Sequence, residues 1–152
     1  SMPPGEAVPK SMELLMQIEA ADTMVYERVG AGGAPELGHV AGAGADVLRG
    51  VLERDVERSF VGQEGLGTSA LLIMGQAAAD EESSLPSGAV RFLLEGMESG
   101  MLGFSYVLPL MGDDGQLLGA LTLIRRAASG PLNHEQPNIC EALRRELSLM
   151  LA

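Results

Sequence analysis

The segment that decides the fold is GFSYVLPLMGDDGQLLGALTLIRR, residues 103–126. Two apolar runs lie on either side of GDDG (112–115), and glycine and aspartate are typical of a tight turn between antiparallel strands. In the second run, residues 117–124, both alternating sets of side chains are mostly apolar. A strand that is apolar on both faces is usually enclosed between two layers. The segment therefore predicts a β-hairpin in a sheet that helices cover on both sides.

The rest of the chain shows the hydrophobic periods of helices and short strands. Residues 1–10 contain three prolines and a glycine, so we expect a leader or linker ahead of one domain, 11–152. The last helix has a capping-box signature, because Gln136 follows Asn133 by three residues and Pro137 lies in the first turn. Hairpins that alternate with helices indicate the α+β class. We expect helices at 11–21, 45–60, 90–101 and 133–152, and strands at 23–29, 36–42 and 70–76 in addition to the hairpin.

The composition argues against several classes of protein. The net charge is −11 and aromatic residues make up 3% of the chain, which disfavours nucleic-acid binding through phosphate contacts or base stacking. No apolar run approaches the ~20 residues that a membrane-spanning helix needs, so we expect no membrane contact. Cys140 is the only cysteine, which excludes an internal disulfide and favours a reducing, cytoplasmic location.

Residue types that catalyse reactions or bind metals do not form a recognisable set in this sequence. The two histidines, His39 and His134, are expected on a strand and in the first turn of the last helix. Neither has the cysteine or carboxylate spacing that would complete a metal site. The acidic run at 80–82 is expected to be a solvated loop, because a hard cation needs oxygen ligands from several directions. We therefore expect no catalytic residue, no metal and no cofactor.

Three segments together resemble a GAF domain, a sensory fold related to PAS domains. SYVLPLMGDDGQLLGALTLIRR (105–126) resembles the paired strands of the family, PLNHEQPNICEALRRELSLMLA (131–152) its closing helix, and ADTMVYERV (21–29) its first strand. The resemblance implies a central antiparallel β-sheet of five or six strands. The terminal helices would pack together on one face, and the middle helices and loops would enclose a ligand pocket on the other face.

The resemblance also limits which member of the family this chain could be. The family's methionine sulfoxide reductases need two loop cysteines and its bilin-binding members a pocket cysteine, whereas Cys140 lies on the last helix. The motif of the cyclic-GMP-binding members is missing. Some members bind haem through a histidine, for which His39 would be the candidate, although a surface histidine is the simpler interpretation.

Two sets of residues follow from the resemblance and the helical periodicity. If a pocket exists, the helix at 90–101 and the first strand of the hairpin should line it, although core packing explains each residue taken singly. The apolar stripes of the terminal helices are expected to form a homodimer bundle. The pocket candidates are Phe92, Met97, Met101, Phe104, Tyr106 and Leu108, and the dimer-helix candidates are Leu14, Ile18, Leu143, Leu147 and Met150.

The function that this resemblance implies is that of a small-molecule-sensing regulatory domain. It would belong to a larger bacterial signalling or transcription-regulatory protein and would control an attached output domain through its terminal helices. The alternative is a dimerisation or scaffold module that binds no ligand. The sequence does not decide between the two.

Overall fold

The structure is a computed structural model that describes residues 3–30, 35–54, 72–75, 104–130 and 132–151. Helices and strands alternate along it in the manner expected for the α+β class. In chain order the elements are helix α1 (Pro4–Gln17), strands β1 (Thr23–Val29) and β2 (Pro35–Gly42), helix α2 (Ala45–Arg54), strands β3 (Leu72–Gly75), β4 (Phe104–Met111) and β5 (Leu117–Arg125), a 3₁₀ turn (Ala127–Ser129) and helix α4 (Gln136–Leu151).

The strands form one antiparallel sheet with the order β2-β1-β5-β4-β3 among the described residues. The hairpin predicted from residues 103–126 is confirmed as β4 and β5, and its turn contains Gly115 at a φ of 80°. β5 is the central strand, paired with β1 on one side and with β4 on the other. The two-sided apolar character of β5 therefore reflects a strand that is buried on both faces.

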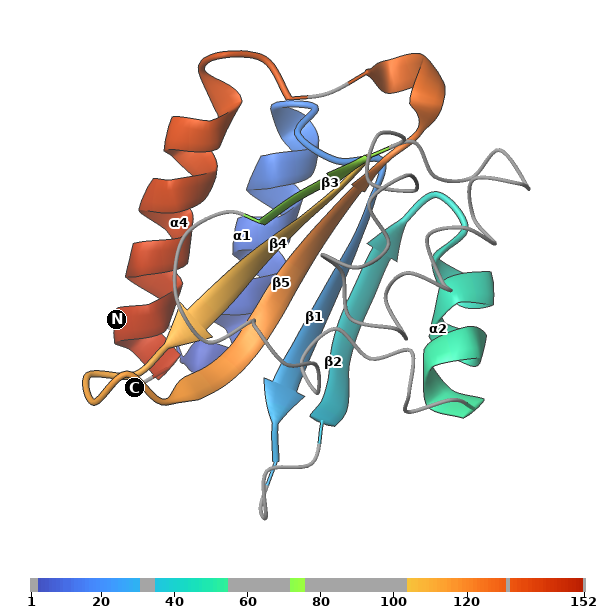
Figure 1. Cartoon of the computed structure of the whole chain (residues 1–152). Coiled ribbons are helices and arrows are strands. Elements are labelled where there is room, and N and C mark those ends of the chain that lie inside the picture. Colours follow the sequence, from blue (N-terminus) through green and yellow to red (C-terminus); the bar gives the residue numbers. More distant parts are fainter. Residues whose placement is uncertain (1–2, 31–34, 55–71, 76–103, 131, 152) are drawn as a thin grey trace.

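Helices lie on both sides of the sheet. Figure 1 shows α1 and α4 next to each other over one face, while α2 lies on the opposite side, beside the edge strand β2. The sequence-based expectation that the terminal helices pack together is confirmed by the contact between α1 and α4. We call the face of the sheet that α1 and α4 cover the helix face, and we call the opposite face the second face.

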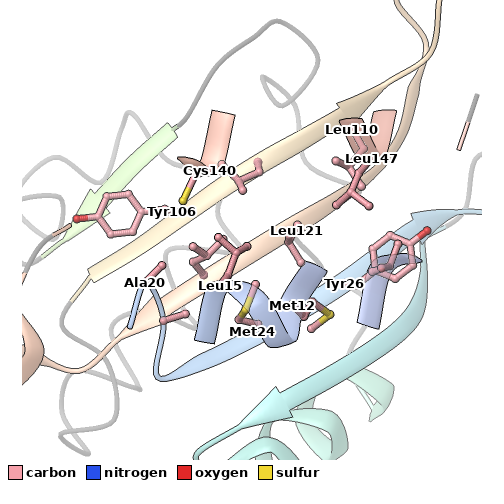
Figure 2. Packing of buried hydrophobic residues seen from close by; sticks show 14 of the residues in the cluster. Met12, Leu15, Ala20, Met24, Tyr26, Tyr106, Leu110, Leu121, Cys140 and Leu147 are labelled. Atoms are coloured by element: carbon pink, nitrogen blue, oxygen red, sulfur yellow. The ribbon is translucent and has the colours of Figure 1, made fainter. Parts of the chain in front are cut away.

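The main hydrophobic core lies between the helix face and the two terminal helices (Figure 2). Leu121 on β5 is at its centre, opposite Tyr26 of β1 and Leu108 of β4, and is completely buried. Strand residues two apart share a face, so Leu123 continues this row on β5. The full cluster comprises Ala7, Val8, Met12, Leu15, Ala20, Ala21, Met24, Tyr26, Tyr106, Leu108, Leu110, Leu121, Leu123, Cys140 and Leu147.

The first helix begins earlier than the sequence pattern indicated. Residues 4–10 were expected to be a leader or linker, but α1 starts at Pro4, and that prediction is wrong. Proline is accommodated in the first helical turn because its missing N–H would have no partner there. Ala7 and Val8 are buried at 4% and 2% exposure, so hydrophobic packing stabilises this turn despite Pro9 inside the helix.

The capping box ahead of α4 is confirmed by reciprocal hydrogen bonds. The backbone N–H of Asn133 donates to Oε1 of Gln136, and the backbone N–H of Gln136 donates to Oδ1 of Asn133, both over 2.9 Å. The side chain of Gln136 has a second role, because its Nε2 donates to the carbonyl of Ile18 over 3.0 Å. The capping residue therefore also joins α4 to the chain that follows α1.

Candidate functional site

The second face of the sheet buries two polar side chains among apolar ones. Thr122 on β5 lies between Val25 of β1 and Val107 of β4, and all three are fully buried. Glu27, two residues after Val25 on β1, shares this face and is only 2% exposed. The neighbouring residue on β5 is Ala120, which pairs with Glu27. This face thus combines a hydroxyl and a carboxylate with small apolar side chains.

The hydroxyl of Thr122 is not satisfied within the described part of the chain. Its Oγ1 is buried and has no hydrogen-bond partner there. The backbone N–H and C=O groups of β5 already form the hydrogen bonds to β1 and β4, so they are poor partners for this hydroxyl. An unmade hydrogen bond at a buried hydroxyl typically costs about 1–3 kcal/mol. A central strand therefore retains a costly residue at a position where valine would fit.

Glu27 is a buried ionisable side chain on the second face. A carboxylate at 2% exposure is costly unless it is paired, and Glu27 does take part in an interaction within the protein. The cost of burying Glu27 is therefore offset at least in part within the protein.

On the helix face, Arg125 at the end of β5 connects the segment that follows α1 to the segment that precedes α4. Its Nε donates to the carbonyl of Gly130 over 2.7 Å, and its Nη2 donates to the carbonyl of Ser129 over 2.9 Å. Its Nη1 donates to the carbonyl of Glu19, just after α1. A guanidinium has five N–H donors in a rigid fork, so one side chain can hold three carbonyls at once.

Asp22, which follows α1, forms further hydrogen bonds to the segment between β5 and α4. Its Oδ2 accepts hydrogen bonds from the backbone N–H of Arg126 and from the hydroxyl of Ser129, both over 2.8 Å. Together with the bond from Gln136 to Ile18, these contacts tie the α1–β1 connection to the β5–α4 connection. We call this set the terminal latch, made of Asp22, Arg125, Ser129 and Gln136.

Cys140 is buried in α4 and is not poised for nucleophilic chemistry. Its exposure is 0%, and burial raises the pKa of its thiol from 9.0 to about 11, although the nearby positive charge of Arg125 acts in the opposite direction. The thiolate is the reactive form of cysteine, so a raised pKa makes the thiol inert. This side chain belongs to the core cluster and reports on the packing of α4.

We expect the pH dependence of stability to show this raised pKa. Above pH 9 the unfolded chain loses the thiol proton, whereas the folded chain keeps it until about pH 11. The free energy of unfolding should therefore fall between these pH values, by about 1 kcal/mol per pH unit from this group. The measurement is urea denaturation of the wild type and of Cys140→Ala from pH 7 to 10.5. Identical pH slopes for the two proteins would contradict the assignment.

The structure corrects part of the predicted pocket. Tyr106 and Leu108 are buried in the core cluster on the helix face, at 2% and 0% exposure. The hydroxyl of Tyr106 accepts a hydrogen bond from the backbone N–H of Leu132 over 2.9 Å. The prediction that these two residues line a pocket on the opposite face is wrong, because the apolar pattern did not reveal which set faces which layer. Phe92, Met97, Met101 and the side chain of Phe104 lie outside the described residues.

The dimer-helix candidates are also divided by the structure. Leu147 is 1% exposed and belongs to the core, so its assignment to an intermolecular surface is wrong. Ile18, Leu143 and Met150 are half-buried against that core. Leu14 is 43% exposed. The exposed large apolar side chains of the terminal helices in the described chain are Leu14, Ile139 at 38% and Leu149 at 74%.

Sequence reasoning did not identify Thr122, Glu27 or Arg125 as functional residues. A signal existed for Thr122, because a polar residue within a strand that is apolar on both faces is expected to be buried. Arg125 gave no such signal, since its acceptor in Glu19 is 106 residues away along the chain.

The two histidines do not contribute to a metal site in the described residues. His39 lies half-buried on β2 and His134 is exposed ahead of α4. No group of three or more His, Cys, Asp or Glu side chains that could hold a metal is found within the described ranges. The described helices also include none that is long and apolar enough to cross a membrane.

Comparison with known proteins defines the fold. No protein-family model matches this chain, and no curated protein matches it in sequence. Among solved structures, the GAF domain/HD domain protein from Geobacter sulfurreducens is 16% identical with a TM-score of 0.70, and the match covers 99% of this chain and 93% of that one. The GAF-B domain of DevS from Mycobacterium smegmatis is 17% identical with a TM-score of 0.57, over 97% of this chain and 92% of that one.

A third similar structure was solved in a photoproduct state. GAF3 of Slr1393 from Synechocystis, in its photoproduct state, is 12% identical with a TM-score of 0.63, over 93% of this chain and 88% of that one. These similarities extend over nearly the whole chain and agree on one architecture. The chain has the fold of a GAF domain, which confirms the resemblance inferred from the hairpin, the closing helix and the first strand.

Proposed function

We propose that this chain is a sensory regulatory domain that binds a small molecule and controls an attached output domain through α1 and α4. Support comes from the fold, which it shares with a GAF domain/HD domain protein and with a domain solved in a photoproduct state. We further propose that it belongs to a larger bacterial signalling protein, acts in the cytoplasm and has no catalytic activity of its own.

The observation that carries this proposal is the terminal latch. α1 and α4 pack against each other and are tied together at one end of the sheet, by Arg125 and Asp22. Their other ends, where the chain enters and leaves the domain, lie at the opposite end of the sheet (Figure 1). Two helices joined in this way respond together to a displacement of the sheet.

Strand β5 supplies a route between the second face and the latch. Thr122 points to the second face, and Arg125, three residues later, holds the connections to both helices. A ligand changes the helix arrangement only if it binds two arrangements with different affinity. Contact with the second face changes the position of β5, and the latch passes this change to α1 and α4.

A homodimer would let the helices act on paired output domains. Leu14 and Leu149 are exposed apolar side chains on α1 and α4, and burying them against a second copy would remove them from water. The alternative function is a scaffold that dimerises through the same helices and binds no ligand.

Native mass spectrometry separates the two functions. A dimer that releases a discrete molecule on denaturation supports sensing. A dimer without added mass, whose thermal stability no small molecule changes, favours the scaffold.

The dimer surface can be tested by charge insertion. We expect Leu149→Lys and Leu14→Lys to weaken dimerisation at least about tenfold, because a lysine ammonium would have to be desolvated at the contact. The measurement is light scattering after size-exclusion chromatography over a range of protein concentrations. Gln116→Lys in the exposed hairpin turn adds the same charge and is the control. A dimer that is unchanged in both leucine variants would place the association surface elsewhere.

A further inference from the structure

Strand β4 has two backbone groups that bind α4 instead of a neighbouring strand. The described part of β3 pairs with Phe104–Val107, so Pro109 and Met111 lie beyond it on β4. Because these two residues are two apart, their backbone groups point to the same edge of the strand. Proline has no N–H, so at Pro109 the carbonyl is the one backbone group that needs a partner at this edge. The N–H of Met111 is the second group.

Two side chains of α4 bind these groups. Nη1 of Arg144 donates to the carbonyl of Pro109 over 3.3 Å. The N–H of Met111 donates to Oγ of Ser148 over 3.1 Å. Glu141 orients the guanidinium, because both of its carboxylate oxygens accept hydrogen bonds from Arg144. Ser148 is 8% exposed and the side chain of Arg144 14%, so water competes little for either bond. We call Arg144 and Ser148 the register lock.

The spacing of the register lock fixes the position of α4 along β4. Residues four apart on a helix are separated by about 6 Å along its axis, and residues two apart on a strand by about 6.8 Å. The two side chains therefore match the spacing of the two strand groups. A shift of α4 by one turn would replace Arg144 by Cys140, which is a weak donor, or Ser148 by Ala152, which has no acceptor. Both bonds form in one register only.

Helix α1 is held differently over most of its length. The buried side chains through which it packs are Ala7, Val8, Met12 and Leu15, all of them apolar. Apolar contacts have no preferred direction, so packed helices can slide past each other by small amounts without losing a specific bond. In the described residues, the polar contacts that hold α1 lie at its C-terminal end, where the terminal latch binds the carbonyl of Ile18.

We infer that α4 and the β4–β5 hairpin move as one unit and that α1 is the terminal helix that moves relative to them, pivoting about the terminal latch. This inference rests on the proposed function and deepens it, because it assigns the transmission of the signal to one of the two helices. The displacement is largest at the start of α1, which lies at the opposite end of the sheet from the latch (Figure 1). The neighbouring end of α4 is kept in place by the register lock.

Distances between pairs of spin labels, measured by double electron–electron resonance, test this difference. Cys140→Ala removes the native thiol, and cysteines are placed at Glu6 on α1, Glu146 on α4 and Arg126 after β5, all of which are exposed. We expect the distance distribution of the 6–126 pair to be at least about twice as broad as that of the 126–146 pair. An excess of unlabelled protein restricts the measurement to distances within one chain. Equal widths for the two pairs would overturn the inference.

Breaking the register lock should release α4. We expect Arg144→Met combined with Ser148→Ala to broaden the 126–146 distribution and to leave the 6–126 distribution unchanged. Ser148→Ala alone should lower the melting temperature by about 2–4 °C, because the N–H of Met111 loses its acceptor. It also repeats the distance test if the double variant does not fold.

The control for the lock variants is Ser11→Ala on α1, which makes the same change in the other terminal helix. It should shift the melting temperature by less than about 1 °C and leave the 126–146 distribution narrow. A 126–146 distribution that stays narrow in the double variant, or in Ser148→Ala if only that variant folds, would show that these bonds do not hold α4 and would overturn the inference.

The two proposals fail in different ways. If the two label pairs give equal widths but native mass spectrometry shows a bound molecule, the sensory function stands and the assignment of α1 as the moving helix is wrong. If the 6–126 pair is the broader one but the protein binds no small molecule, the difference between the two helices stands and the sensory function is wrong.

Discussion

Replacing Arg125 with methionine is expected to lower the free energy of unfolding by about 3 kcal/mol. The guanidinium of Arg125 is the donor for the carbonyls of Glu19, Ser129 and Gly130, and the residue is 7% exposed. A hydrogen bond from a charged group contributes about 1.5–3 kcal/mol, and the substitution removes the bonds to all of these carbonyls, although water can replace part of them because Glu19 and Ser129 are exposed. Relief from burying the charge offsets part of this loss.

The measurement is urea denaturation followed by circular dichroism, with Arg126→Met as the matched control. Arg126 is the next residue, has the same side chain and is exposed, so its replacement should change stability by less than about 0.5 kcal/mol. Arg125→Lys should resemble Arg125→Met, because a single ammonium does not match the three-carbonyl geometry of the guanidinium. Equal stability of the Arg125→Met and Arg126→Met variants would contradict the latch.

Thiol labelling of Cys140 gives a second readout that is specific to α4. This cysteine is buried in α4 and close enough to Arg125 for that charge to lower its pKa. If the latch holds the start of α4 on the sheet, Arg125→Met should accelerate labelling under native conditions more than an equally destabilising core substitution elsewhere does. Because the chain has one cysteine, labelling reports on this site alone.

Replacing Leu121 with alanine is expected to lower the free energy of unfolding by about 3–4 kcal/mol. Leu121 is fully buried at the centre of the helix face, opposite Tyr26 and Leu108, on a strand that is paired on both sides. Truncation removes buried apolar surface and leaves a cavity that the rigid sheet cannot close, and such substitutions cost about 2–5 kcal/mol. Chemical denaturation measures the loss.

The same substitution at Leu149 is the control. Leu149 is 74% exposed on α4, so its truncation should change the stability of the monomer by less than about 0.5 kcal/mol. The two variants have the same chemical change and differ only in burial. A loss below about 1 kcal/mol for Leu121→Ala would contradict the placement of the core between the sheet and the terminal helices.

These predictions concern one face of one strand. Leu121 packs in the core under the terminal helices, and Arg125 joins the segment after α1 to the segment before α4. Substitutions on the helix face should change stability and the helix arrangement.

Several features of the fold followed from local sequence. The β4–β5 hairpin was predictable because its turn residues and the two apolar runs lie within one short segment. The capping box of Asn133 and Gln136 was predictable because it joins residues three apart. Strand β1 was predicted at 23–29 and is observed at Thr23–Val29. Their order and spacing were also enough to infer the GAF fold.

Other features depended on contacts between distant segments. Alternation showed that Tyr106 and Leu108 share a face, but β4 and β5 are apolar on both sides, so the pattern did not determine which set meets α1 and α4. Similarly, the apolar stripe of the last helix indicated that Leu147 is buried, either in the core or at a dimer surface. Only the packing of α4 on the sheet placed it in the core. The start of α1 at Pro4 depended on the burial of Ala7 and Val8.

By itself, the sequence determined the elements whose signals are local: the turn, the cap and the alternation of apolar residues along each strand. Tertiary structure alone decided the latch and the burial of Thr122 on the second face. Arg125 donates to a carbonyl 106 residues earlier in the chain. Thr122 lies between β1 and β4, two strands that are far apart in the sequence. The physical reason is that hydrogen-bond partners and burial are properties of the space around a side chain, which the neighbouring residues in sequence do not define.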